Sequence, residues 1–99
     1  MVEITRNGDT MTALLSGEID HHSAADMRVA IDGQTQRHKP KMLQLDFSGV
    51  KFMDSSGIGL VMGRYRNIQL IGGKLKVINI PNNLRKMFEI SGLSCLGII

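Results

Sequence analysis

The chain has 99 residues, of which 42% are apolar and 21% charged, so it fits one small globular domain and not a disordered chain. The net charge of +3 divides into −2 over residues 1–54 (six basic, eight acidic) and +5 over residues 55–99 (six basic, one acidic). This two-signed charge disfavours nucleic-acid binding, as does the small number of aromatic residues, four, which form no series on which bases could stack. No apolar stretch is long enough for a membrane helix, and the N-terminus has no apolar signal-peptide region, so we expect no membrane association. The single cysteine, Cys95, cannot form an internal disulfide, and we therefore expect a cytoplasmic protein.

Strand and helix signals alternate along the chain. Apolar stretches bounded by turn residues predict strands over residues 2–6, 10–15, 42–47 and 74–80, with a last short strand within 93–99. Apolar side chains that recur every three or four positions predict helices over residues 24–36, 58–70 and 84–91. The Asn7-Gly8 pair predicts a hairpin turn, and residues 16–20 and 48–53 are predicted to be connections.

The predicted order is ββαβαβα with a final β, which is typical of the α/β class. Strands that alternate with helices favour parallel central strands joined by right-handed crossovers. We therefore expect a single domain over residues 1–99, with a central mixed sheet of about four or five strands flanked by helices. Ser23 is the predicted N-cap of the first helix.

The segment Met53-Asp54-Ser55-Ser56-Gly57 lies where a predicted strand meets the start of a helix. Ligands and partners gather at this end of α/β sheets, and a helix N-terminus favours an anion. A serine hydroxyl here can simply cap the helix, or it can carry a phosphate. A nucleotide-cradling loop and a nucleophilic serine are both disfavoured, because the third Gly, the following Lys and the Gly-x-Ser-x-Gly pattern are absent.

Residues 16–23, 46–59 and 90–93 together resemble the anti-sigma factor antagonists, the STAS-domain proteins of bacterial sigma-factor regulation. The resemblance is especially close to the type that controls the forespore sigma factor in sporulation, and its specific part is the Met53–Gly57 segment. It implies a STAS-type fold and a partner-switching protein that regulates transcription. Such a protein is not an enzyme and needs no cofactor.

The resemblance also implies how the switch works. Ser55 would be phosphorylated by a partner that is both an anti-sigma factor and a serine kinase. The unphosphorylated form would bind this partner and release the sigma factor, whereas the phosphorylated form would not bind. A phosphatase of the PP2C type would restore the first form.

The same resemblance implies a partner-binding surface around Ser55. Its expected members are Glu18, Asp20, Asp54, Ser56, Gly57 and Gly59. Ser56 would cap the second helix, and Gly57 would leave space for the kinase. Asp20 would pair with a basic residue of the partner, and the alternative is that Asp20 caps the first helix.

Other features receive structural interpretations. We expect no metal site at His21-His22, because adjacent side chains point in different directions. Arg64 and Arg66 are expected on a solvated helix face, while Met53 and Met62 are expected to fill the core. Family members usually run on into a strand and a final helix, so this chain is expected to lack the C-terminal helix.

Two alternative functions remain. The first is a STAS module of a transporter or a sensory complex, which the lack of a membrane segment or an attached domain disfavours. The second is a small nucleotide-binding domain or enzyme, because the resemblance leaves weak nucleotide binding open. No base or metal set supports turnover by the chain alone.

Overall fold

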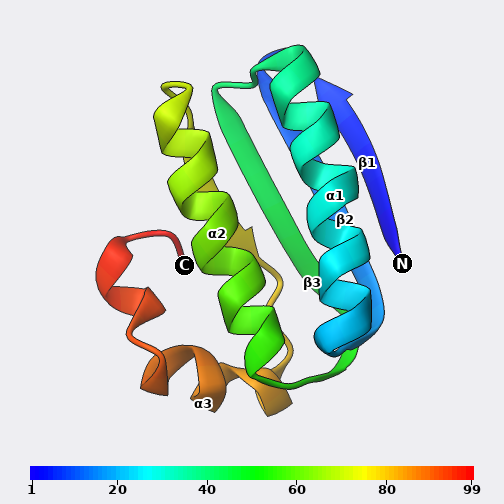
Figure 1. The fold of residues 1–99 in the computed structure, drawn as a ribbon. Helices are drawn as coiled ribbons and strands as arrows, with labels where there is room; N and C mark the ends of the chain where they lie inside the picture. The colour runs from blue at the N-terminus through cyan, green and yellow to red at the C-terminus, as the bar shows by residue number, and fades with distance from the viewer.

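A four-stranded sheet with two long helices on one face forms the main part of the molecule (Figure 1). The structure is a computed structural model that describes residues 1–99. The strands are β1 (Val2–Asn7), β2 (Thr10–Ile19), β3 (Met42–Met53) and β4 (Lys74–Ile78). The helices are α1 (His21–His38), α2 (Ser55–Leu70) and α3 (Asn82–Ile90), followed by a 3₁₀ turn, η1 (Leu93–Leu96). The predicted α/β class and the order ββαβαβα are confirmed.

The sheet has the order β1-β2-β3-β4. The hairpin strands β1 and β2 are antiparallel, whereas β2, β3 and β4 run parallel to one another, so the predicted mixed sheet is confirmed with four strands. Because α1 and α2 each connect two parallel strands, both helices start at the edge where β2 and β3 end. This edge therefore gathers two strand ends and two helix N-termini.

The core lies between the sheet and the helices. Alternate side chains of β2 and β3 point toward α1 and α2, as the period of two in a strand requires. They are Met11, Ala13, Leu15, Leu43, Leu45 and Phe47, all almost fully buried. The opposite face of the sheet carries mostly polar side chains, and there the hydroxyl of Thr12 donates to Oε1 of Gln44 at 3.1 Å. None of the helices has the length and hydrophobicity that a membrane span requires.

Strand β3 is longer than predicted. Residues 48–53 are not a connection but continue the strand, with register shifts against β2 at two places. Each shift places an extra residue in β3, which interrupts the alternation of buried side chains that a sequence pattern can detect. Gly49 allows the close approach of the two strands here, because a Cβ atom would lie 2.9 Å from the carbonyl oxygen of Leu15.

The last predicted strand is wrong. Residues 93–96 form the 3₁₀ turn η1, which is bounded by Gly92 and Gly97 with φ angles of 81° and 71°. Both glycines are in the left-handed conformation, which is incompatible with an extended strand. The C-terminal segment nevertheless reaches the edge of β4, where the carbonyl of Ile98 accepts from the amide of Val77 at 2.6 Å. Nearby, α3 is attached to the core through an edge-to-face contact between Phe88 and Phe47.

Candidate functional site

The structure brings the two segments singled out in the sequence together at the carboxyl edge of the sheet. Ile19, the last residue of β2, is paired with Met53, the last residue of β3. The next amide, that of Asp54, donates to the carbonyl of Ile19 at 3.1 Å. The Glu18–Asp20 segment and the Asp54–Ser55 segment therefore lie side by side, although more than 30 residues separate them in the chain.

Asp54, and not Ser56, caps helix α2. Oδ1 of Asp54 accepts from the amide of Ser56 at 2.8 Å, so the expectation that Ser56 supplies the cap is wrong. Ser55 is the first residue of the helix, its side chain is exposed, and its hydroxyl makes no hydrogen bond to another protein group. The hydroxyl of Ser55 is thus accessible from solvent, and the helix is capped without it.

Gly57 is buried beneath this first turn. A Cβ atom at this position would lie 2.1 Å from Sδ of Met53, far inside van der Waals contact. The close packing of α2 on Met53, and not space for a partner, is therefore what requires glycine here. Gly59 differs, because it is exposed and a Cβ atom there would meet nothing within 4 Å.

Asp20 caps helix α1 in the same way as Asp54 caps α2. Oδ1 of Asp20 accepts from the amides of His22 and Ser23, each at 2.9 Å. In return, the hydroxyl of Ser23 accepts from the amide of Asp20 and donates to the carbonyl of Glu18 at 2.8 Å. The helix starts at His21, so the prediction of Ser23 as its N-cap is wrong, and the capping alternative for Asp20 is confirmed.

The cap of α1 should make the stability of the protein depend on pH in acid. The hydrogen bond from the amide of Ser23 is the main influence that holds the pKa of Asp20 below its ordinary value of 3.8. The carboxylate therefore stabilises the fold at pH values above about 4, and this contribution is lost as the pH falls through the lowered pKa. Asn at this position still accepts the hydrogen bonds but does not titrate.

We expect the melting temperature of Asp20→Asn to fall less between pH 5 and pH 2 than that of the wild type, as thermal unfolding followed by circular dichroism would show. The matched control is Asp26→Asn, which changes an exposed carboxylate on the same helix with no hydrogen bond to the backbone. Its melting temperatures should follow those of the wild type. Equal slopes for Asp20→Asn and the wild type would contradict the role of the charged cap.

Phe52 was not expected at the site. Its side chain is 56% exposed at the carboxyl edge of the sheet, directly opposite Glu18 on β2. Residues 48–53 are predicted to be a connection, but they continue β3, whose bulges bury Val50 and Met53 and turn Phe52 outward. An exposed aromatic ring three residues before Ser55 is a candidate contact for a protein partner.

Arg64 was expected on a solvated face and is instead 4% exposed, so that prediction is wrong, whereas Arg66 is exposed as expected. Nε of Arg64 lies 2.8 Å from Oδ1 of Asp32, a residue of α1. The other carboxylate oxygen of Asp32, Oδ2, accepts a hydrogen bond from the side-chain amide of Asn67 at 3.3 Å. This buried ion pair joins the two long helices. Its signal in the sequence is the position of Arg64 four residues before the buried Ile68 and three after the buried Val61.

The remaining singled-out residues have separate outcomes. Met53 is buried as predicted, but Met62 is 44% exposed, so its assignment to the core is wrong. The rings of His21 and His22 meet edge to face at the exposed start of α1. No three His, Cys, Asp or Glu side chains come close enough to hold a metal ion.

The comparisons with known proteins agree with this architecture. Residues 1–97 match the model of the STAS domain family. An anti-sigma F factor antagonist from Paenibacillus polymyxa is 33% identical over 92 residues, which are 93% of this chain and 79% of the relative.

Two solved structures extend the likeness to three dimensions. The anti-sigma factor antagonist SpoIIAA in its unphosphorylated form superposes with a TM-score of 0.83 at 32% identity, covering 94% of this chain and 82% of that one. The Bacillus cell fate determinant SpoIIAA in its phosphorylated form gives 0.76 at 32% identity, covering 95% and 86%. The chain therefore belongs to the STAS domain family, within its group of anti-sigma factor antagonists.

Proposed function

We propose that this protein is an anti-sigma factor antagonist whose binding is switched off by phosphorylation of Ser55. The observation that carries the proposal is the exposed hydroxyl of Ser55 at the first position of α2, beside the end of β2. Support comes from the similar SpoIIAA, whose structures are described as unphosphorylated and phosphorylated. The partner would be an anti-sigma factor with serine kinase activity, and a PP2C-type phosphatase would reverse the modification.

The physical basis of the switch is the change of charge at a surface that must be desolvated on binding. A phosphate adds about −1.5 to −2 charges and three acceptor oxygens. Asp54 precedes Ser55, and Glu18 and Asp20 end the neighbouring strand, so the edge already carries three carboxylates. Burying a phosphate among them against a partner costs free energy unless the partner supplies matching positive charge.

The contact surface would extend along the carboxyl edge of the sheet, from Glu18 and Asp20 past Phe52 to Ser55. Phe52 would supply apolar area, and the carboxylate of Asp20, already held by the cap of α1, would face a basic residue of the partner. The protein itself would act without catalysis or a cofactor, in the cytoplasm, in the regulation of transcription during sporulation.

The direct test is phosphorylation by the cognate kinase with ATP. We expect the wild type to gain one phosphate, located on Ser55 by mass spectrometry, and Ser55→Ala to gain none. Ser55→Ala should fold as the wild type does, because Asp54 supplies the helix cap. In the same experiment, the unphosphorylated wild type should retain the kinase in a pull-down, and Ser55→Asp should retain much less.

The matched control is Ser56→Ala, which changes the neighbouring hydroxyl and leaves the backbone bond to Asp54 intact. It should be phosphorylated like the wild type. Phosphate on Ser56 while Ser55 stays unmodified would refute the assignment. The pull-down with Asp20→Asn, which keeps the cap and removes the charge, measures whether that charge contributes to partner binding.

A further inference from the structure

A second surface lies at the end of the molecule opposite Ser55, where α1 and α2 both finish and β3 and β4 begin (Figure 1). The two chain segments there touch, because the amide of Lys74 donates to the carbonyl of Lys41 at 2.9 Å. A hollow of about 180 Å³ opens between the ends of the two helices. We call the exposed residues around this hollow the amino-end surface, and they are Arg37, Lys39, Lys41, Leu70, Ile71 and Lys74.

The centre of the amino-end surface is apolar. Leu70 is 79% exposed and Ile71 is 37% exposed, although both are large apolar side chains. They form one side of the hollow, and Thr35 and Gln36 of α1 form the other. An apolar side chain that entered the hollow from outside would therefore remove Leu70 and Ile71 from water.

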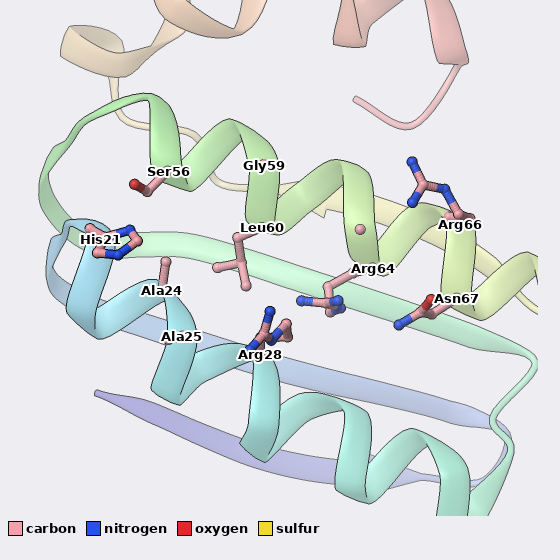
Figure 2. A pocket seen from close by; sticks show the side chains of 11 residues that line it. His21, Ala24, Ala25, Arg28, Ser56, Gly59, Leu60, Arg64, Arg66 and Asn67 are labelled. Atoms are coloured by element: carbon pink, nitrogen blue, oxygen red, sulfur yellow. The ribbon is translucent and has the colours of Figure 1, made fainter.

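The polar groups in the wall of the hollow already have partners within the protein. The hydroxyl of Thr35 donates to the carbonyl of Asp32 at 3.1 Å. The carboxylate of Asp32 is engaged by Arg64 and Asn67, whose side chains extend from α2 toward α1 (Figure 2). The hollow therefore suits an apolar side chain of a partner better than a polar ligand, and charges act only around its rim.

The rim of the amino-end surface is positive. Residues 36–41 and 69–74 contain four basic side chains and no acidic one. Lys41 lies 3.9 Å from the carboxylate of Asp9, whereas Arg37, Lys39 and Lys74 have no ion pair. A cation in the last turn stabilises a helix, which accounts for Arg37, but Lys41 and Lys74 lie beyond the helices. These charges are complementary to the carboxylates of an acidic partner.

We infer that the amino-end surface binds an acidic, amphipathic segment of a protein partner, which places one apolar side chain in the hollow and its carboxylates against Arg37, Lys39 and Lys74. An apolar centre within a polar rim is the arrangement of protein–protein contacts. A flat anionic membrane would also attract the positive charges, but it would leave the hollow unfilled. Because this surface and Ser55 lie at opposite ends of the molecule, the chain can hold such a partner in either state of the proposed switch.

The test selects a library of random peptides, displayed on phage, on the unphosphorylated wild-type chain. We expect enriched peptides with a large apolar residue flanked by Asp or Glu, and a dissociation constant in the micromolar range that rises with salt. In the ¹⁵N-labelled protein, these peptides should shift the amides of Gln36, Leu70 and Ile71. Enrichment without acidic residues, or shifts only around Ser55, would overturn the inference. Binding to phosphatidylglycerol vesicles with no peptide that maps to the amino-end surface would overturn it in favour of a membrane.

Leu70→Gln should weaken the binding of a selected peptide roughly tenfold or more. Its matched control is Ile90→Gln, which removes a side chain of similar exposure, 76%, from α3. Lys74→Glu reverses a charge of the rim and should weaken binding as well, whereas Lys86→Glu makes the same change on α3 and should not. Ser55→Asp should bind the peptide as tightly as the wild type does. Equal losses in Leu70→Gln and Ile90→Gln, or a loss in Ser55→Asp, would overturn the inference, and no kinase enters the experiment.

Discussion

Replacing Gly57 by alanine is expected to destabilise the protein by about 2 kcal/mol, although alanine is the better helix former. The new methyl group would lie 2.1 Å from Sδ and 2.2 Å from Cγ of Met53, whose side chain is 2% exposed and has little room to move. The start of α2 or the end of β3 must then shift, and both carry the proposed site. Urea unfolding followed by circular dichroism measures the loss.

Gly59→Ala is the matched control. It lies in the same helix, a Cβ atom there meets nothing within 4 Å, and it should stabilise the protein by about 0.5–1 kcal/mol. In a Met53→Ala background the added methyl at residue 57 enters the space that Met53 leaves, so most of its cost should disappear. If Gly57→Ala and Gly59→Ala change stability in the same direction and by the same amount, the contact with Met53 is not the reason for glycine at residue 57.

Asp32→Asn is expected to cost about 2–3 kcal/mol. The substitution keeps the shape of the side chain but removes the charge that faces Arg64. The side chain of Arg64 is only 5% exposed. Breaking a fully buried ion pair on one side costs about 3–5 kcal/mol, and the 22% exposure of the Asp32 side chain reduces that figure. The midpoint of urea unfolding, at an unchanged slope, reports the effect.

Two further variants separate the ion pair from the loss of a surface charge. Asp26→Asn removes an exposed carboxylate from the same helix and should change stability by less than about 0.5 kcal/mol. Asp32→Asn combined with Arg64→Met removes both charges and should recover most of the loss, because no buried charge is then left without a partner. A single variant Asp32→Asn as stable as the wild type would show that Arg64 does not need its carboxylate.

The periodic parts of the fold could be predicted from the sequence, and the irregular parts could not. The strands and helices with regular apolar spacing were found, because one face of each is buried against the other layer. The end of β3 was missed because its bulges replace a period of two with steps of three, from Phe47 to Val50 to Met53. Residues 93–99 are predicted to be a strand because they are mostly apolar. Leu93 and Ile98 are indeed buried, but they have no regular spacing that would distinguish a turn from a strand.

The candidate site shows the same division. The segment around Ser55 could be located from the sequence, since a strand end followed by a helix start has local signals, whereas the segment around Asp20 was implied as part of the site only by the family resemblance. Which side chain caps each helix could not be decided, because Asp and Ser are both favoured cap residues, and each helix start offers one of each within three positions: Asp20 and Ser23, and Asp54 and Ser56. The spacing of Arg64 from Val61 and Ile68 places it on the buried face of α2, but its partner Asp32 lies on another helix, and a contact over 32 residues of chain leaves no local pattern.

The capped start of α2 has a consequence for how fast the protein can respond. Ser55 belongs to a helix whose cap, first turn and supporting strand are held by Asp54, Gly57 and Met53, none of which uses the serine side chain. In the proposed switch, a change of charge at Ser55 therefore requires no rearrangement of the backbone. The new state is complete once the bond to phosphorus has formed or broken, and the delay in signalling is set by the modifying enzymes and by partner release, with no microsecond-to-second relaxation of the fold to add to it.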